Sequence, residues 1–292
     1  MLISETNPIL HCRVLNRNNI PNNNQQNNGT PPPPPAGKLS LSNIVQPQPN
    51  VPNQRVIRAW KLAKGPAPKQ VIPLKLFQTY HTLNVPPHMK QNIERLKAQN
   101  PEFTYMLFDD KMCRDFIKAH FANDVVNAFD ALKPGAYKAD LWRYCVLYIY
   151  GGIYMDIKFN CVNNFKLVDL LDKEYYVKDR YHRGRYGIYQ AVMVNVAKNP
   201  ILWECIQQIV RNVRAKYYGD NPLCITGPHL LCKYFKQEDI SKMELYNGPE
   251  GDCVYIRGYK IIDIYPNYRK EQRATQNTQY YNKMWHAKDV YA

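Results

Sequence analysis

Residues 138–158 read KADLWRYCVLYIYGGIYMDIK and predict a helix, a glycine stop and a short buried strand. Apolar side chains three and four residues apart indicate the helix, at Leu141, Tyr144, Cys145 and Tyr148. Gly151 and Gly152 end it. The apolar run over residues 153–157 is too short for a helix and contains one acid, Asp156. Because open α/β sheets bind ligands at strand ends, this acid predicts a functional site; the alternative is a strand-end acid paired with a neighbouring lysine.

Three other polar side chains of this stretch are candidates for the same site. Asp140 and Arg143 lie three residues apart on one helix face, where they form either an intrahelical ion pair or part of the site. Tyr154 shares a sheet face with Asp156 because side chains alternate along a strand. Its hydroxyl either binds a phosphate or only packs, and both readings stay open.

The rest of the chain alternates between strand-like and helix-like segments. Strands are expected at residues 74–80, 103–108, 175–178 and 188–196, with short β-like runs over 243–264. Helices are expected to begin at Pro86, at Asp109 or Asp110, and at Pro200. This alternation predicts an α/β fold with a mostly parallel central sheet.

Composition divides the chain into an arm and a core. Residues 1–70 contain an Asn/Gln-rich run and five consecutive prolines, which predicts a disordered basic arm. Residues 71–292 suffice for one α/β domain. The net charge is +15, and the arm contributes +7 from eight basic residues and one acid. Arg180, His182, Arg183 and Arg185 form a basic loop that either lines an anion site or is merely solvated.

Read in order, these motifs resemble glycosyltransferase family 32, the DxD-motif, Och1-like sugar transferases, in a soluble viral or bacterial form. Lys-Ala-Asp-x-x-Arg-Tyr at 138–144 and Tyr-Gly-Gly-x-Tyr-x-Asp at 150–156 carry the resemblance. Weaker matches follow at 77–79, 100–110, 226–228 and 285–291. The chain also distantly resembles the glucosylating domains of clostridial toxins. The resemblance implies a GT-A type, Rossmann-like nucleotide-sugar domain.

The second acid of the motif is absent, because residues 156–158 are Asp-Ile-Lys rather than Asp-x-Asp. In the family this acid coordinates a divalent metal, Mn²⁺ or Mg²⁺, and a protonated lysine has no lone pair to do so. Three outcomes are open. Other groups hold the metal, with Asp156 and His286 as candidates; the Lys158 ammonium neutralises the leaving diphosphate; or the chain binds a sugar nucleotide without turnover.

The resemblance also implies roles for single residues. Those expected at the reacting groups are Asp156, Arg143 and Lys158, and those expected to bind the donor are Asp140, Tyr154, Gln78, Thr79 and Trp285. Gln190 and Asn195 are expected to bind the acceptor or sugar. Trp285 and His286 belong to a terminal segment that either closes over the donor or packs on the core.

The resemblance implies a retaining glycosyltransferase. It would move a hexose from a UDP- or GDP-sugar to a hydroxyl acceptor on a glycan or protein. The alternatives are a sugar-nucleotide-binding pseudoenzyme and a nucleic-acid-binding protein that uses the basic arm; nucleic acid is the weaker partner because the core has no nucleic-acid motif. The sequence shows no signal-peptide pattern and no apolar run long enough to span a membrane, which favours a cytoplasmic location, in the host cytoplasm or a virion for a viral protein.

Overall fold

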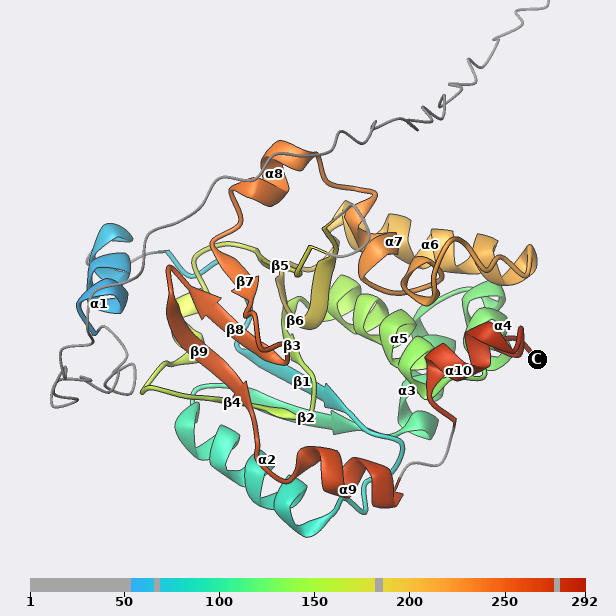
Figure 1. The fold of residues 1–292 in the computed structure, drawn as a ribbon, viewed down its shortest axis with the longest axis horizontal. Coiled ribbons are helices and arrows are strands. Elements are labelled where there is room, and N and C mark those ends of the chain that lie inside the picture. Colours follow the sequence, from blue (N-terminus) through green and yellow to red (C-terminus); the bar gives the residue numbers. More distant parts are fainter. Residues whose placement is uncertain (1–53, 66–68, 182–185, 276–278) are drawn as a thin grey trace, which may run out of the picture. The chain divides into compact units, whose positions relative to one another are not determined.

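The chain folds around a mixed β-sheet that is covered by helices (Figure 1). This computed structural model describes residues 54–65, 69–181, 186–275 and 279–292. Within these residues the sheet has nine strands, in the order β2-β1-β3-β6-β5-β7-β8-β9-β4. The predicted α/β class is confirmed.

Three neighbouring strands at one side of the sheet are parallel. β1 (Lys75–Thr79) lies between β2 (Thr104–Phe108) and β3 (Gly152–Met155) and pairs in parallel with both. The carboxyl ends of these strands therefore meet at one sheet edge, the position at which α/β sheets bind ligands.

Most of the remaining pairings are antiparallel, so parallel pairing is confined to β2-β1-β3 and to β5 with β7. The other strands are β4 (Phe159–Cys161), β5 (Tyr175–Lys178), β6 (Ile188–Asn195), β7 (Leu245–Asn247), β8 (Cys253–Ile256) and β9 (Tyr259–Ile264). In β6 the antiparallel register places Asn195 opposite Gly152 and Val192 opposite Met155. Residues at the start of β6 thus lie near the end of β3.

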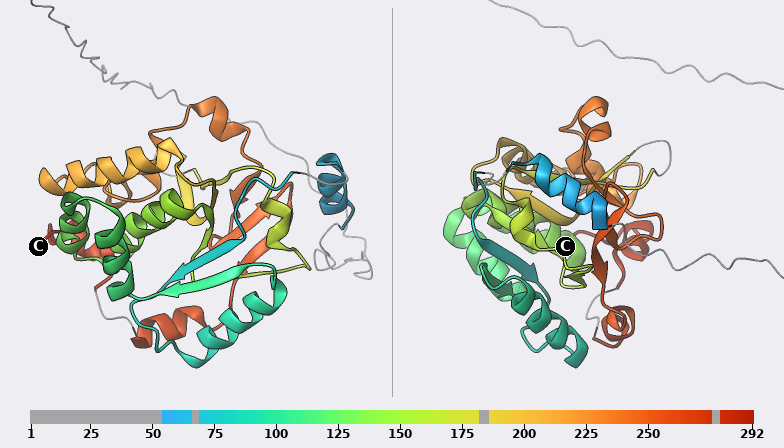
Figure 2. Two further views of the ribbon diagram at one scale, coloured as in Figure 1. Left: turned by 180° about the vertical axis from the view of Figure 1, so that it is seen from behind. Right: turned by 90° about the vertical axis from the view of Figure 1, so that its left-hand side faces the viewer.

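Helices cover both faces of the sheet, and α5 and α6 run side by side (Figure 2). Their bounds are α1 (Gln54–Ala63), α2 (Pro87–Gln99), α3 (Asp110–His120), α4 (Asn123–Ala131), α5 (Gly135–Tyr150), α6 (Pro200–Arg214), α7 (Pro228–Cys232), α8 (Gln237–Ser241), α9 (Tyr268–Thr275) and α10 (Tyr281–His286). Two 3₁₀ turns, η1 (Leu167–Leu170) and η2 (Pro222–Cys224), complete the set for the described residues. Asp109 caps α3 by accepting a hydrogen bond from the Met112 backbone at 2.8 Å.

Two glycines connect α5 to β3 and allow β3 to approach β1. Gly151 has φ 61° and Gly152 has φ 109°, both in the left-handed region that favours glycine. A Cβ atom on Gly152 would lie 2.6 Å from the Lys75 carbonyl oxygen, and one on Gly151 would lie 2.7 Å from the Ala197 nitrogen. The glycine pair therefore fixes the distance between the end of α5 and the strand that leads to Asp156.

The side chains of β3 alternate between two hydrophobic cores. Tyr154 packs into a core formed mainly with α3, α4, α5 and α6. Ile153 and Met155 belong to the core on the opposite face, which includes residues of α1 and η1. This alternation confirms that Tyr154 and Asp156 share one face, since the Tyr154 hydroxyl bonds the Asp156 carboxylate.

The predicted boundary between arm and core at residue 70 is wrong. Residues 54–63 form α1, in which Trp60 is only 1% exposed and donates a hydrogen bond to Glu244 at 2.7 Å. Ile57 is also buried. An amphipathic helix with two buried apolar side chains gains enough burial to order its backbone, which the local composition did not reveal. Residues 1–53, the rest of the predicted arm, lie outside the described residues.

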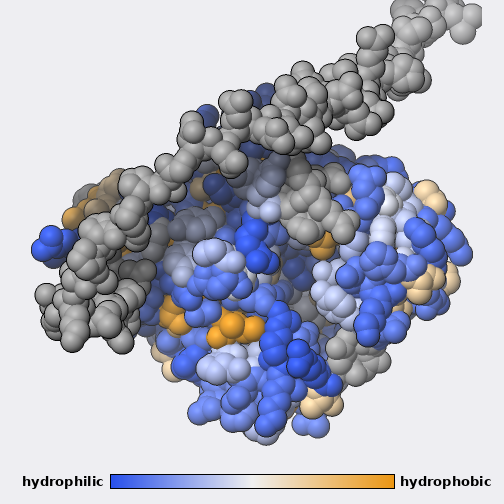
Figure 3. Space-filling model, in the orientation of Figure 1, coloured by the Kyte–Doolittle hydropathy of each residue, from blue (hydrophilic) through white to orange (hydrophobic). Residues whose placement is uncertain are grey.

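The surface that faces the viewer in Figure 3 is mainly hydrophilic, with small and separate apolar areas. No helix among the described residues has the length and apolar character needed to cross a bilayer.

Candidate active site

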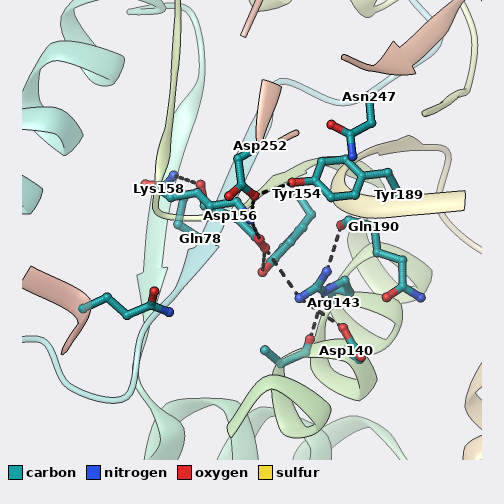
Figure 4. Close-up of polar contacts among 12 residues, drawn as sticks. Gln78, Asp140, Arg143, Tyr154, Asp156, Lys158, Tyr189, Gln190, Asn247 and Asp252 are labelled. Atoms are coloured by element: carbon teal, nitrogen blue, oxygen red, sulfur yellow. Dashed lines mark hydrogen bonds and ion pairs between the residues drawn. The ribbon is translucent and has the colours of Figure 1, made fainter. Parts of the chain in front are cut away.

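A cavity of about 580 Å³ lies at the carboxyl ends of the three parallel strands. Its lining includes Thr79 at the end of β1, Asp110 just after β2 and Asp156 just after β3. Asp140 and Arg143 of α5 line it from the side. The predicted convergence of residues 140, 143 and 156 on one cavity is therefore observed (Figure 4).

Asp156 is held by side chains from both sides of the cavity. Its Oδ1 accepts a hydrogen bond from the Tyr154 hydroxyl at 2.8 Å and lies 3.5 Å from Arg143 Nη2. Its Oδ2 lies 3.2 Å from Lys158 Nζ. Burial raises the pKa of Tyr154 well above its ordinary value, so the hydroxyl keeps its proton and donates it. These contacts fix the orientation of the carboxylate toward the cavity.

Arg143 connects Asp156 to α5. Its Nε donates to the Ala139 carbonyl at 3.2 Å, its Nη1 donates to the Gln190 carbonyl at 2.9 Å, and its Nη2 lies 3.2 Å from Asp140. The guanidinium also stacks on the Tyr154 ring, 4.5 Å from its centroid. Every nitrogen of Arg143 thus contacts a protein group, and the side chain holds both acids at fixed positions.

Asp140 is buried in the wall of the cavity. Burial raises its pKa to about 6, although Arg143 and the Thr226 hydroxyl favour the ionised form. Thr226 donates to Asp140 Oδ2 at 2.7 Å. The carboxylate is consequently ionised at neutral pH and protonated in mildly acidic solution.

Lys158 bridges two carboxylates. Its Nζ lies 3.2 Å from Asp156 Oδ2 and 2.8 Å from Oδ1 of Asp252, which belongs to the turn between β7 and β8. Burial would lower the pKa of Lys158, but Tyr189 and the carboxylates of Asp156 and Asp252 outweigh it and raise the pKa well above its ordinary value. Arg269 of α9 forms a second ion pair with Asp252. The residue that replaces the second motif acid is therefore a permanent cation facing the cavity.

The side chains present do not match a divalent-metal site. No group of three or more His, Cys, Asp or Glu side chains that could hold a metal occurs in the described part of the chain. Two cavity acids, Asp156 and Asp252, are close enough to each other to share an ion, and both form ion pairs with the Lys158 ammonium. Divalent cations in proteins are held by several oxygen ligands, and here an ammonium occupies the space between the available oxygens.

The two residues of β1 that were predicted to bind the donor both use their side chains to bond other parts of the protein. Gln78 is fully buried and does not line the cavity; it donates to the Asp156 carbonyl at 3.2 Å and accepts from the Tyr105 hydroxyl at 2.9 Å. It therefore positions the backbone of Asp156. Thr79 does line the cavity, but its hydroxyl donates to the Phe108 carbonyl at 2.9 Å.

The two residues predicted to bind the acceptor or sugar differ in position. Gln190 lines the cavity and its amide donates to the Thr226 carbonyl at 3.2 Å and to the Tyr144 hydroxyl. Asn195 lies at the other end of β6, where it donates to Tyr176 at 2.7 Å and to Glu174 at 3.1 Å. The antiparallel register with β3 explains this separation, so the assignment of Asn195 to the site is wrong.

The C-terminal segment reaches the cavity through residues other than the two that were predicted. Trp285 packs against the core and donates to the Tyr218 carbonyl at 2.8 Å, and His286 is exposed; neither lines the cavity. Tyr280 and Tyr281, at the start of α10, line it instead. His286 therefore supplies no metal ligand to this cavity, because its side chain is exposed and does not line it.

Sequence reasoning missed the part of the cavity that comes from β6, the β7–β8 turn and α9. Its members are Tyr189, Asn247, Asp252, Tyr268 and Arg269. Arg180 of the predicted basic loop also lines the cavity, while His182, Arg183 and Arg185 lie outside the described residues. The Gly-Asp pair at 251–252 marked a turn in the sequence, but nothing local placed that turn beside Lys158.

Comparison with protein families identifies the region that contains these residues. Residues 86–177 match the family described as "Glycosyltransferase sugar-binding region containing DXD motif". The match covers under a third of the chain. The matched range includes Asp140, Arg143, Asp156 and Lys158, so the part of the chain that is similar to this family supplies the α5–β3 side of the cavity.

Several curated proteins are similar in sequence to part of this chain. The chain is 29% identical over 176 residues to mannosyl phosphorylinositol ceramide synthase SUR1 of Saccharomyces cerevisiae, covering 59% of this chain and 44% of that protein. It is 31% identical over 159 residues to inositol phosphoceramide mannosyltransferase 2 of Schizosaccharomyces pombe, covering 54% and 44%. It is 32% identical over 81 residues to the uncharacterized glycosyltransferase L373 of Acanthamoeba polyphaga mimivirus, covering 28% and 32%. The chain thus spans less than half the length of these relatives.

Among solved structures, the PaToxG glycosyltransferase aligns with a TM-score of 0.47 at 15% identity, covering 63% of this chain and 76% of that one. The ligand-free glycosyltransferase domain of the YGT toxin aligns with a TM-score of 0.36 at 8% identity, covering 59% and 66%.

Proposed function

We propose that this chain is a retaining glycosyltransferase that moves a hexose from a nucleoside diphosphate sugar, UDP- or GDP-linked, to a hydroxyl acceptor on a glycan or protein. The observation that carries the proposal is the convergence of Asp140, Arg143 and Asp156 on one cavity at the carboxyl ends of parallel strands. All three lie within the family match. We place the activity in residues 54–292, the part that forms the sheet and the cavity.

Each side chain has a chemical task in this proposal. The Asp140 and Asp156 carboxylates accept hydrogen bonds from hydroxyls of the sugar, since ionised oxygens form the stronger hydrogen bonds. Arg143 keeps the two acids in place. Lys158 and Arg269 face the diphosphate and stabilise the charge that grows on it as the bond from the sugar to the phosphate oxygen breaks. Preorganised positive charge at a leaving group lowers the barrier because it costs no reorganisation during the reaction.

The names of the relatives suggest which sugar to test first. Two of them are a mannosyltransferase and a mannosyl phosphorylinositol ceramide synthase. We therefore propose mannose as the first hexose to examine, with glucose and N-acetylglucosamine as alternatives.

The direct test uses the full chain with radiolabelled GDP-mannose, UDP-glucose and UDP-N-acetylglucosamine, each with and without manganese. We expect release of the nucleoside diphosphate and transfer of label to water or to an added glycan, with at least one donor. In an Asp156→Asn variant, the rate of nucleoside diphosphate release should be at least about 100-fold lower than in the wild type. Asp263→Asn, at a carboxylate that pairs with Lys260 and does not line the cavity, should retain it. The proposal fails if no donor is consumed, or if Asp156→Asn is as active as the wild type.

A second candidate, the sugar-nucleotide-binding pseudoenzyme, is supported by the lysine at position 158. It predicts that a donor binds, as measured by calorimetry, and that neither diphosphate nor transferred label appears. The same set of donors therefore separates the two candidates.

A further inference from the structure

We propose that Lys158, held in place by Asp252, is a built-in cation that lets this site bind a nucleoside diphosphate without a divalent metal. The inference rests on the proposed function and concerns the same cavity. It assigns the diphosphate to a side chain of this protein instead of to a bound ion.

The first support is the position of the ammonium. Lys158 Nζ lies between Asp156 Oδ2, at 3.2 Å, and Asp252 Oδ1, at 2.8 Å, and the side chain is only 12% exposed. The ammonium is also near the rings of Phe159 and Tyr189, with centroids at 5.0 and 5.6 Å. A divalent cation coordinated by the same two carboxylates would have to occupy this space. It would also repel the ammonium at close range.

The second support is the construction of the turn that carries Asp252. Gly251 and Asp252 both have positive φ, 73° and 51°. A non-glycine residue rarely adopts this conformation, and such strain is kept where neighbouring contacts require it. Here the contacts are a hydrogen bond from the Tyr189 hydroxyl at 3.0 Å and ion pairs with Lys158 and Arg269. Asp252 is therefore a positioning residue that fixes Lys158 at the cavity wall.

The third support is the charge balance of the cluster. Its carboxylates are Asp140, Asp156 and Asp252, and its cations are Arg143, Lys158 and Arg269; all six line the cavity. Three negative and three positive charges leave this ion-paired network neutral without an added ion; Asp110, Asp179, Glu250 and Arg180 also line the cavity and are not part of the network. A divalent metal held by the carboxylates of this network would need negative charge that its own cations have not already neutralised.

Binding experiments on the full chain test this inference independently of turnover. UDP and GDP are titrated by calorimetry in EDTA and again in MnCl₂, and free Mn²⁺ is followed by electron paramagnetic resonance as protein is added. We expect at least one nucleotide to bind in EDTA, with a Kd that manganese changes by less than about threefold. Mn²⁺ alone should not bind to the wild-type cavity.

Variants at position 158 separate the charge from the packing. Lys158→Met keeps the apolar stem and should weaken binding of the nucleotide in EDTA by at least about tenfold. Lys158→Asp places three carboxylates together and should make both Mn²⁺ binding and manganese-dependent nucleotide binding appear. The matched control is Lys260→Met, because Lys260 also bridges two carboxylates, Glu250 at 2.8 Å and Asp263 at 3.2 Å, without lining the cavity. It should bind as the wild type does.

The outcomes are distinct. Nucleotide binding by the wild type that requires manganese, or Mn²⁺ binding to the wild-type cavity, would overturn this inference and leave the proposed function standing. So would a folded Lys158→Met protein with wild-type affinity in EDTA. The absence of nucleotide binding in every buffer would overturn both proposals. The wild-type titrations decide the question even if a variant does not fold.

Discussion

Lys158 Nζ lies 2.8 Å from Asp252 Oδ1, which joins the end of the β3 segment to the turn between β7 and β8. The two residues come from distant parts of the chain, one inside the range that matches the glycosyltransferase family and one beyond it. The contact shows that the turn between β7 and β8 supplies an ion-pair partner for Lys158, the residue that stands where the DxD motif has its second acid. The position of the Lys158 ammonium therefore depends on strands that the family match does not include.

Removal of the Tyr154 hydroxyl tests how strictly Asp156 must be oriented. In Tyr154→Phe the ring stays in the core, while the 2.8 Å hydrogen bond to Asp156 is lost. We expect the turnover rate to fall about tenfold and the free energy of unfolding to fall by only about 1 kcal/mol. Steady-state kinetics and urea unfolding measure the two effects.

The control for this variant is Tyr259→Phe. The Tyr259 hydroxyl is also in a largely buried ring and donates to the Asn163 carbonyl at 2.7 Å, away from the cavity. This variant should lose similar stability and no activity. Equal losses of activity in the two variants would show that Asp156 is not positioned by Tyr154.

Arg143→Lys tests the role of the guanidinium as a fixed link between the two acids. A lysine has one nitrogen, so it cannot replace three nitrogens that contact Ala139, Gln190 and both carboxylates. We expect the free energy of unfolding to fall by about 3 kcal/mol, as for other broken buried ion pairs, with loss of turnover. Chemical unfolding gives the stability change.

The matched variant is Arg114→Lys, at an exposed arginine that bonds Asp130 through two nitrogens, each at 2.7 Å. Exposed pairs contribute little, so this change should lower the free energy of unfolding much less than Arg143→Lys does. If both substitutions cost the same, the burial of the Arg143 cluster has no energetic consequence.

Asp140 should give the protein a specific pH dependence. Its pKa in the folded state is about 6, above the ordinary value of 3.8, chiefly because of burial. A carboxyl group with a raised folded pKa stabilises the fold below its unfolded pKa and loses that contribution as the pH rises through the folded pKa. The difference in free energy of unfolding, Asp140→Asn minus wild type, should therefore increase by about 1–3 kcal/mol between about pH 4 and pH 7.

The same ionisation should appear in the kinetics. Turnover by the wild type should fall as the pH drops below about 6, because the protonated carboxyl accepts hydrogen bonds from sugar hydroxyls more weakly. Unfolding curves and rate measurements over this pH range check both effects. A stability difference that does not change with pH would show that Asp140 is not perturbed by burial.

Glu271 should stabilise the beginning of α2, which starts at proline and has no side-chain cap of its own. Its carboxylate accepts hydrogen bonds from the backbone nitrogens of His88, at 2.9 Å, and Met89, at 3.0 Å. We expect Glu271→Ala to lower the free energy of unfolding by about 1–2 kcal/mol, as the loss of a helix cap does. Glu94→Ala, which removes an exposed pair with Lys97 in the same helix, should cost less than about 0.5 kcal/mol. Similar costs for the two variants would contradict the capping role.

The α5–β3 side of the site was predictable because its signals are local. Helical spacing, two glycines and an apolar run define the elements, and strand alternation places Tyr154 and Asp156 on one face. These signals needed no knowledge of the sheet order. The predicted convergence on a ligand site then followed from the general position of sites at strand ends.

The rest of the site depends on pairings between distant strands. Asn195 was assigned to the site although the antiparallel register of β6 carries it to the opposite end from Asp156. Asp252 was overlooked because only the order of β5, β7 and β8 brings its turn to Lys158. Similarly, Tyr281 of α10 lines the cavity, whereas Trp285 bonds the Tyr218 carbonyl instead. Sequence periodicity reports which residues share a face, and it contains no information on strand order.

A crystal structure of the full chain with a bound nucleotide sugar tests the central claim most directly. The account predicts that the sugar contacts the carboxylates of Asp140 and Asp156 and that the diphosphate lies within hydrogen-bond distance of Lys158 Nζ. A nucleotide sugar bound outside this cavity, or bound within it with the sugar remote from both carboxylates, would contradict the account.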